Sequence, residues 1–222
     1  MLFEISNVAK AYKKKTVLKD ISLTVHPGEC VGILGENGSG KSTLLSILAG
    51  VNQCDSGSFK IDGEDAFANR QLREKTVGYV PQNTPLISEL SAWDNLRMWY
   101  DASSLTKSLE EGFLGMLGIG SFIKTPVKEM SGGMKKRLSI GCAIHAKPAL
   151  LLLDEPTASL DIVCKERIYT YFQNYKKNGG ALILSTHEVQ EIELCDRLYI
   201  IKNGVLEEYS YDGNMSKLAG RL

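Results

Sequence analysis

The residues with the clearest chemical potential lie between Gly35 and Thr43, in the segment GENGSGKST. This segment matches G-x-x-x-x-G-K-[ST], the pattern of a phosphate-binding loop. Glycines let successive backbone N–H groups turn towards an anion, and a helix N-terminus adds its partial positive charge. Lys41 is expected to reach the β- and γ-phosphates of a nucleotide, and the Ser42 hydroxyl to ligate Mg²⁺. The candidate nucleotide contacts in this loop are Gly35, Asn37, Gly38, Ser39, Gly40, Lys41, Ser42 and Thr43.

The flanking sequence gives this pattern its structural context. Residues 29–34 form a short apolar segment that favours a strand, and residues 43–50 have the apolar spacing of a helix that a glycine ends. An ordinary glycine turn before a helix is the alternative interpretation. The strand on one side and the helix on the other favour phosphate binding.

Two further apolar runs end in polar residues that suit the same chemistry. Leu150–Leu153 is followed by Asp154 and Glu155, and residues 181–186 are followed by His187. Ligands of an open α/β sheet bind beyond the carboxyl ends of its strands. Asp154 is therefore a candidate Mg²⁺ ligand, Glu155 could orient or deprotonate a water, and His187 could donate to the γ-phosphate.

Each of these residues also has a plainer interpretation. Asp154 and Glu155 could cap the turn that begins at the following proline, and a lone histidine after a strand is more often structural. Gln82, after the strand at residues 76–80, would be unremarkable alone. The combination with the phosphate loop favours a site for phosphoryl transfer, which needs positioning and charge neutralisation.

Composition limits the remaining choices. The chain has 222 residues with 43% hydrophobic content, enough for one α/β domain, and 26 basic residues balance 26 acidic ones. This balance argues against a nucleic-acid partner. Five scattered cysteines are typical of reduced thiols in a cytosolic protein, and three histidines make a zinc site improbable. We expect neither a signal peptide nor a membrane-spanning segment, so a membrane role would require another chain.

The predicted elements change character along the chain. Strands are expected at residues 2–8 and 16–25, with a lysine-rich loop at 10–15 that is either a solvated turn or, through Tyr12, a stacking site for a base. Residues 91–147 are predicted to be helical, with helices starting at Ser91, spanning 109–117 and starting at Ser131. Strands return in the last third, with a helix at 161–177 and a final hairpin around Asn203-Gly204.

Over nearly its whole length the sequence resembles the ATP-binding cassette (ABC) ATPases. The resemblance implies that Tyr12 stacks on adenine, that Gly35–Thr43 is the Walker A loop, and that Gln82 is the Q-loop glutamine that contacts Mg²⁺. Asp154 and Glu155 match the Walker B aspartate and the catalytic glutamate.

Three further motifs extend this resemblance. Ser131-Gly132-Gly133 is similar to the core of the family signature, residues 159–161 to the D-loop with Asp161 near the nucleotide, and His187 to the switch histidine. The signature departs from Leu-Ser-Gly-Gly-Gln with Met130 and Met134. A methionine in the last position also occurs among exporters of the ABC-2 type, although it removes a side-chain amide.

The family implies an α/β P-loop NTPase fold with a mostly parallel core sheet, an N-terminal antiparallel β subdomain and an inserted helical subdomain. We expect one ABC domain over residues 1–222, with a core at 1–88 and 148–222 and helices at about 89–147. ATP and Mg²⁺ are the implied cofactors. The implied partners are a second cassette, paired head to tail, and the transmembrane permease that it powers, on the inner face of the cell membrane.

The sequence leaves open the direction of transport and the assembly on which the ATPase acts. Export is favoured by Met134 and by the absence of an extension after the last hairpin, and the alternative is an ABC ATPase acting as a mechanical switch on a soluble or cell-envelope assembly. Residues 84–87 and the helix bearing Trp93, Leu96, Trp99 and Tyr100 could line a groove for a cytoplasmic helix of the permease, or could only pack the helical part.

Overall fold

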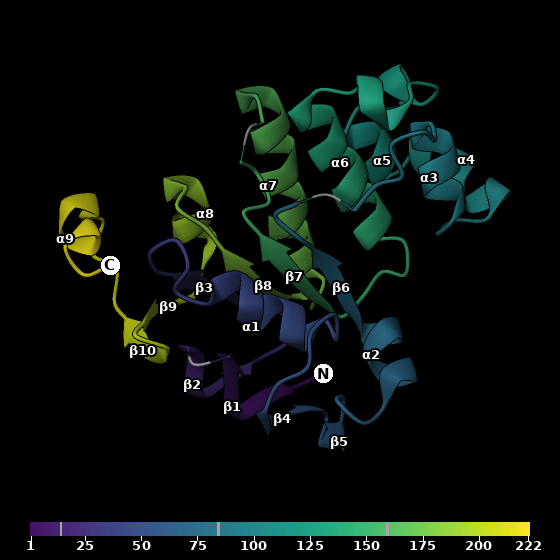
Figure 1. Cartoon of the computed structure of the whole chain (residues 1–222). Coiled ribbons are helices and arrows are strands. Elements are labelled where there is room, and N and C mark those ends of the chain that lie inside the picture. Colours follow the sequence, from purple (N-terminus) through teal and green to yellow (C-terminus); the bar gives the residue numbers. More distant parts are fainter. Residues whose placement is uncertain (14, 84, 159) are drawn as a thin grey trace.

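The chain folds around a mostly parallel sheet that carries a layer on each face (Figure 1). The computed structural model describes residues 1–13, 15–83, 85–158 and 160–222. The strand order of the sheet is β10–β9–β3–β8–β7–β6, and its strands are β3 (Cys30–Leu34), β6 (Val77–Val80), β7 (Leu150–Asp154), β8 (Ala181–Ser185), β9 (Arg197–Lys202) and β10 (Val205–Tyr209). Only the β9–β10 pairing is antiparallel among the described pairs of this sheet. The predicted fold class is confirmed.

Strand β7 shows why the central strands read as continuous apolar runs. Leu150 and Leu152 belong to one core cluster, together with α1 (Lys41–Leu48), whereas Leu151 and Leu153 belong to another, with the helices on the opposite face. All four leucines are fully buried. A parallel strand covered on both faces has no position for a polar residue until its end, which is where Asp154 lies.

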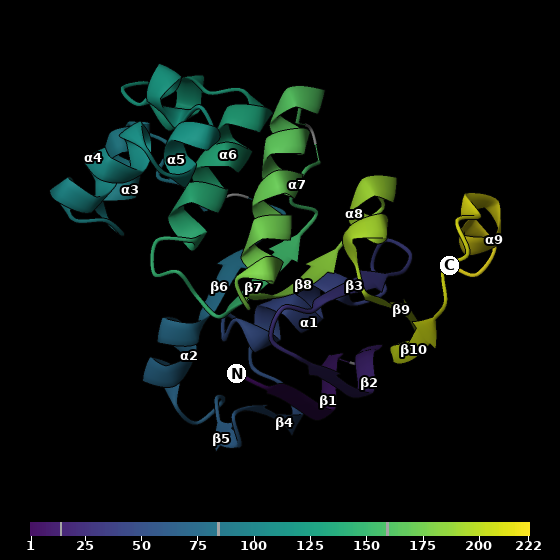
Figure 2. The same cartoon turned by 180° about the vertical axis from the view of Figure 1, so that it is seen from behind.

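A second, antiparallel sheet covers α1 on the side away from the core sheet (Figures 1 and 2). Its order is β2–β1–β4–β5, with β1 (Phe3–Tyr12), β2 (Lys15–Val25), β4 (Ser56–Ile61) and β5 (Glu64–Asp65). The predicted loop at residues 10–15 is wrong in part, because Lys10, Ala11 and Tyr12 continue β1 and pair with β2. Lys14 lies outside the described residues.

The opposite face of the core sheet carries the helices that follow β6. They are α3 (Ala92–Arg97), α4 (Ala102–Glu110), α5 (Phe113–Met116), the 3₁₀ turns η1 (Ile119–Phe122) and η2 (Val127–Glu129), α6 (Gly132–Ala143) and α7 (Ile162–Lys177). Figures 1 and 2 both show α6 and α7 side by side above the sheet. The helix predicted at residues 109–117 is wrong in its bounds, because α4 starts earlier, at the cap Asp101, and Gly112 separates it from α5.

Shorter helices complete the chain. They are α2 (Arg70–Thr76), α8 (Val189–Leu194) and α9 (Met215–Ala219). The sequence pattern did not predict them, since none has more than two turns on which an apolar spacing could repeat.

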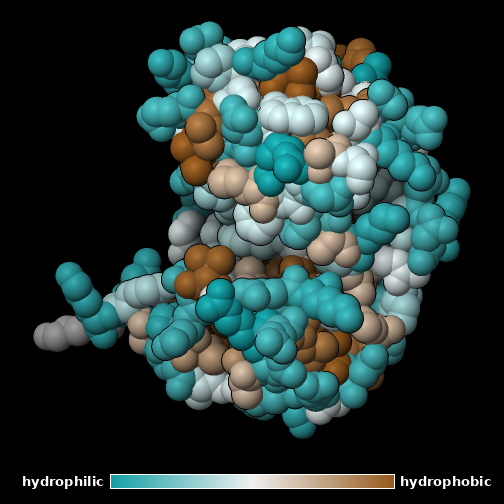
Figure 3. All heavy atoms as spheres, turned by 90° about the vertical axis from the view of Figure 1, so that its right-hand side faces the viewer, coloured by the Kyte–Doolittle hydropathy of each residue, from teal (hydrophilic) through white to brown (hydrophobic). Residues whose placement is uncertain are grey.

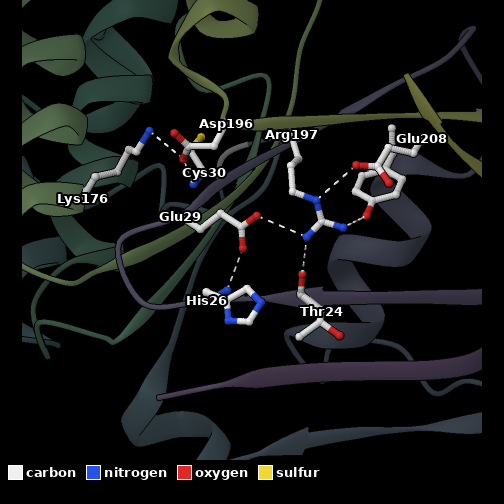
Figure 4. Close-up of polar contacts among 9 residues, drawn as sticks. Thr24, His26, Glu29, Cys30, Lys176, Asp196, Arg197 and Glu208 are labelled. Atoms are coloured by element: carbon white, nitrogen blue, oxygen red, sulfur yellow. Dashed lines mark hydrogen bonds and ion pairs between the residues drawn. The ribbon is translucent and has the colours of Figure 1, made fainter. Parts of the chain in front are cut away.

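Polar contacts join the edge of the core sheet to the antiparallel sheet (Figure 4). Arg197, at the start of β9, donates to Glu29 Oε1 at 3.2 Å, to Thr24 O at 3.1 Å and to Glu208 Oε1 at 3.3 Å. Asp196 accepts from the Cys30 backbone N–H at 2.7 Å. One arginine therefore links β2, β9, β10 and the segment before β3, the strand that leads into the phosphate loop.

Candidate functional site

The predicted phosphate loop connects β3 to α1 and is shaped by glycines. Gly35 has a φ of +151°, and a Cβ added to it would lie 2.6 Å from the Ile201 carbonyl oxygen. Gly40, with a φ of +115°, leads directly into α1, where a Cβ would lie 2.8 Å from the Leu18 side chain. A side chain at either position would both strain the backbone and displace a neighbour, so the loop depends on glycine there.

The loop holds buried polar groups that are suited to binding an anion. The Ser39 hydroxyl is buried and has no partner among the described residues. Lys41 is only 6% exposed, and its Nζ donates to the loop's own carbonyls, at 2.7 Å to Gly35 and 3.1 Å to Glu36. Burial lowers the pKa of Lys41, while the charges of Glu155 and Asp154 act in the opposite direction. These groups fit a polyphosphate, whose oxygens would accept hydrogen bonds from Lys41 in place of the neutral carbonyls of the loop.

A cavity of about 410 Å³ opens beside the loop. Its walls include residues 36–39, the start of β2 and the turn at Asn203-Gly204. Tyr12 ends β1 with 45% of its surface exposed, and the Lys10 ammonium lies 5.4 Å from its ring centroid. The ring is therefore available for stacking on a base, and it lies on a strand rather than on the predicted loop.

The carboxyl ends of β6 and β7 bring Gln82, Asp154 and Glu155 together. Asp154 is buried, and its Oδ1 accepts from the Ser185 hydroxyl at the end of β8. The Glu155 N–H donates to the Ser185 carbonyl at 3.0 Å, and Glu155 Oε2 accepts from Gln82 Nε2 at 3.0 Å. Glu155 has a φ of +48°, which is uncommon for a residue with a side chain, and it turns the chain sharply after β7.

The structure places His187 less tightly than the other candidates. It lies two residues beyond β8, its side chain is exposed, and no hydrogen bond of its ring occurs within the described part of the chain. The adjoining Thr186 is buried, and its hydroxyl accepts from the Glu188 N–H at 2.9 Å. His187 is thus at the correct edge of the sheet, but no described contact joins it to Glu155.

The glycine-serine motif and Asp161 both lie at helix starts. Ser131 caps α6, and its hydroxyl accepts from the Met134 N–H at 3.2 Å. Ser131 and Gly132 are exposed, and no described hydrogen bond joins this motif to the phosphate loop. Asp161 caps α7 by accepting from the Cys164 N–H at 2.9 Å, and Ser159 lies outside the described residues. Both exposed caps are free to face another molecule.

Three buried polar residues near the site were not predicted from the sequence. Lys136, in α6, is 5% exposed, and Glu191, in α8, is fully buried. Ser185 donates to Asp154. The signal for Ser185 was present, since it is a polar residue at the end of an otherwise apolar strand. Lys136 and Glu191 lie in mixed helical sequences, where no local pattern distinguishes a buried charge from a solvated one.

Comparison with known proteins identifies the family. The family model described as "ABC transporter" matches residues 18–158, more than half of the chain. The chain belongs to the ABC transporter family. The matched region includes the phosphate loop, Gln82, the signature motif and Asp154-Glu155.

Relatives of this ABC chain are known in several bacteria. It is 35% identical over 226 residues to the linearmycin resistance ATP-binding protein LnrL of Bacillus subtilis (strain 168), with 100% of this chain and 72% of the relative covered. It is 34% identical over 215 residues to the lantibiotic transport ATP-binding protein SrtF of Streptococcus pyogenes, with 96% and 93% covered. The Nod factor export ATP-binding protein I of Sinorhizobium fredii is 37% identical over 206 residues, and this chain covers 60% of it.

Solved structures agree with the ABC fold. A dimeric ATP-binding cassette in a post-hydrolysis state, bound to ADP and Pi, superposes with a TM-score of 0.86 and 27% identity, covering 96% of this chain and 100% of that one. A nucleotide-free cassette at 21% identity and a TM-score of 0.82 shows the fold alone. Within the described residues of the present ABC chain, no helix is both long and apolar enough to cross a bilayer.

Proposed function

We propose that this chain is the ATP-binding and ATP-hydrolysing subunit that powers a separate transmembrane permease, in the direction of export. The observation that carries the proposal is the meeting of Lys41, Asp154, Glu155 and Gln82 at one edge of the sheet, beside a glycine loop shaped for phosphate. The names of the relatives support the direction, since they are associated with Nod factor export and lantibiotic transport.

The division of labour follows from where each group lies. Lys41 would exchange the carbonyls of Gly35 and Glu36 for phosphate oxygens, and the backbone of residues 35–43 would cradle the remaining phosphates. Tyr12 would stack on adenine. Glu155, held in its sharp turn and hydrogen-bonded to Gln82, would orient and deprotonate the attacking water, and His187 would donate to the γ-phosphate.

The side chains at this edge suit Mg²⁺. The candidate ligands are the Ser42 hydroxyl, the Gln82 amide and the Asp154 carboxylate, and Ser185 orients the last of these. Among the described residues no cluster of three or more histidine, cysteine or acidic side chains is able to hold a metal ion. Mg²⁺ typically takes one or two carboxylates plus substrate phosphates, so a single buried aspartate fits it. When bound, Mg²⁺ would neutralise charge on the phosphates.

The exposed motifs at Ser131 and Asp161 support pairing with a second cassette. We propose that residues 1–222 act as one unit, with a core at 1–88 and 148–222 and a helical part at about 89–147, that pairs head to tail with another. Ser131, Gly132 and Gly133 would then present the start of α6 to ATP held by the partner. The solved dimeric cassette is consistent with such an arrangement.

The permease is proposed to dock on the helical side. Trp99 is 53% exposed and lies against His145, with ring centroids 5.1 Å apart. Beside this pair is a cavity of about 890 Å³ between α4–α5 and the end of α7, lined by Tyr100, Phe113, Tyr171 and Tyr175 among others. Figure 3, which views the molecule from the side of α3 and α4, shows hydrophobic patches among hydrophilic residues. Such a groove suits a short amphipathic helix and would hold the subunit at the inner face of the membrane.

Replacing the proposed catalytic carboxylate tests this function directly. Glu155→Gln keeps the size of the side chain and removes its basicity, so ATP hydrolysis should fall by about 100-fold or more. Binding of Mg·ATP should persist, and an ATP-bound dimer should accumulate in size-exclusion chromatography. Glu207→Gln, at an exposed position in β10, is the matched control and should behave as the unaltered protein. Undiminished turnover of Glu155→Gln would exclude Glu155 as the catalytic carboxylate. Isolation of the chain from membranes without any membrane protein partner would contradict the proposed association with a permease.

A further inference from the structure

A buried lysine in α6 contacts both strand ends that carry the proposed catalytic pair. Lys136 is 5% exposed, and its Nζ donates to the Pro81 carbonyl at 3.2 Å and to the Asp154 carbonyl at 3.1 Å. Both acceptors are backbone oxygens at the carboxyl ends of the neighbouring strands β6 and β7. A lysine on a helix therefore bridges two strands at the point where each leaves the sheet.

The two acceptor residues directly precede the two proposed catalytic residues in the sequence. Pro81 comes before Gln82, and Asp154 comes before Glu155. The side chains of Gln82 and Glu155 are themselves joined by a 3.0 Å hydrogen bond. A shift of Lys136 would move the backbone at both ends of this bond at once, whereas no other described side chain donates to both carbonyls.

Lys136 lies in the same helix as the Ser131-Gly132-Gly133 motif. It lies five residues after Ser131, which caps α6, and a helix rises about 1.5 Å per residue. The Ser131-Gly132-Gly133 motif, whose first two residues are exposed, and the buried ammonium thus belong to the same helix. Lys136 therefore connects the helix that begins at the motif directly to the two strand ends.

Packing alone does not account for a lysine here. Burying an ammonium group is costly unless its donors are satisfied, and an apolar side chain would fill the same space at lower cost. Two carbonyls satisfy part of this requirement, and the carboxylates of Asp154, Glu155 and Glu191 provide a favourable negative field. These interactions offset part of the cost of burying the ammonium group, and its two hydrogen bonds give it a means of positioning the strand ends.

We infer that Lys136 is a positioning residue that links the signature motif of its own subunit to the Gln82–Glu155 pair. The inference rests on the proposed function, because the motif is taken to face ATP held by a second cassette. Engagement of Ser131-Gly132-Gly133 with that ATP then sets the geometry of Gln82 and Glu155 in the same subunit as the motif. ATP binding at one composite site is in this way coupled to the geometry of Gln82 and Glu155 in the other.

Steady-state kinetics of three variants of the 222-residue chain test this inference. Lys136→Met removes the donors while keeping a long unbranched side chain, Lys136→Arg keeps donors, and Lys177→Met makes the same change at an exposed site in α7. Lys136→Met should lower kcat by about ten- to a hundredfold, as expected for a small misplacement of catalytic groups, with KM and the affinity for a fluorescent ATP analogue little changed. Lys136→Arg should recover most of the loss, and Lys177→Met should show none.

The outcomes separate positioning from a purely structural role. A fall in kcat at constant nucleotide affinity, rescued by arginine, supports the inference. An unchanged kcat for Lys136→Met overturns the inference. So does a joint fall in kcat, nucleotide affinity and melting temperature that is as large in Lys136→Arg as in Lys136→Met. Failure of the unaltered protein to hydrolyse ATP would instead overturn the proposed function, so the two failures are distinguishable.

Discussion

At the scale of single residues, the site is built from charges and dipoles held under unusual conditions. Lys41 and Asp154 are buried, and Glu155 occupies a left-handed backbone conformation. Such features cost free energy in a folded protein and persist when surrounding contacts enforce them. Here those contacts come from the ends of β6 and β8, through Gln82 and Ser185.

Glu191 offers a residue-scale prediction about pH. Its carboxyl group is fully buried, and its Oε1 accepts from the Thr157 hydroxyl at 2.6 Å. Burial raises the pKa of Glu191 above its ordinary value of 4.5, and the hydrogen bond from Thr157 acts in the opposite direction. The folded state then binds a proton more readily than the unfolded state, so the contribution of this group to stability is fully present below pH 4.5 and is lost as the pH rises from there to the pKa of the folded state.

Glu191→Gln removes this ionisation but keeps an acceptor oxygen. The free energy of unfolding of the variant should therefore decline less than that of the unaltered protein between about pH 5 and about pH 8. Urea unfolding at a series of pH values measures this, with the exposed Glu207→Gln as control. Parallel curves for Glu191→Gln and the unaltered protein would argue against a raised pKa at this position.

At the scale of elements, caps and strand ends decide where chemistry is possible. Ser91 starts α3 with a capping box, in which its hydroxyl accepts from the Asp94 N–H at 3.2 Å and Asp94 accepts from the Ser91 N–H at 3.3 Å. Ser131 starts α6 with a simpler cap, in which its hydroxyl accepts from the Met134 N–H without a reciprocal bond. Satisfying the free N–H groups of a helix in this way fixes its first turn.

Loss of the Ser91 cap should be measurable. Ser91→Ala should lower the free energy of unfolding by about 1 kcal/mol, because the Asp94 N–H loses its partner. Ser108→Ala, within α4, is a suitable control, since alanine there should be neutral or slightly favourable. Chemical denaturation followed by circular dichroism reports both values, and equal stability of the two variants would contradict the role of the cap.

The sequence predicted the elements that have long or distinctive patterns. Runs such as Leu150–Leu153 could be recognised because every position is buried, and the Ser91 cap because its spacing to Asp94 is specific. The short helices α2 and α8 and the break at Gly112 could not, because tertiary packing and not local periodicity determines them. Likewise Gln82, Asp154 and Glu155 could be predicted from motifs, whereas the burial of Lys136 depends on contacts between distant segments.

At the scale of the whole molecule, the exposed faces indicate how work would be transmitted. Leu96 is fully buried and contributes to the helical core, so the packing interpretation holds for this residue and the docking groove does not include it. Leu86, Trp93 and Tyr100 pack partly against the same core, whereas Trp99 is exposed. The helix predicted to bear all of these aromatics ends at Arg97, so Trp99 and Tyr100 lie in the turn that follows it, and the two interpretations apply to different residues.

Trp99 is accordingly the residue with which to separate docking from packing. Trp99→Ser should uncouple transport in the assembled complex while sparing the ATPase activity of the isolated subunit, since half of its surface is already solvated. Leu86→Ser should in addition lower stability, because Leu86 packs against the core. Transport and ATPase assays of reconstituted complexes provide the readout. Retained coupling in Trp99→Ser would exclude this face as the docking site.

The central claim is that a triphosphate binds at the ends of the parallel strands, against Lys41 in the glycine loop. Calorimetric titration of the purified chain with Mg·ATP tests this claim most directly when Lys41→Ala and the exposed Lys177→Ala are titrated alongside. We predict binding by the unaltered protein and by Lys177→Ala, and an affinity about ten- to a hundredfold weaker for Lys41→Ala, the loss expected for a charged hydrogen bond. Absence of binding by the unaltered protein, or an undiminished affinity of Lys41→Ala, would contradict the account.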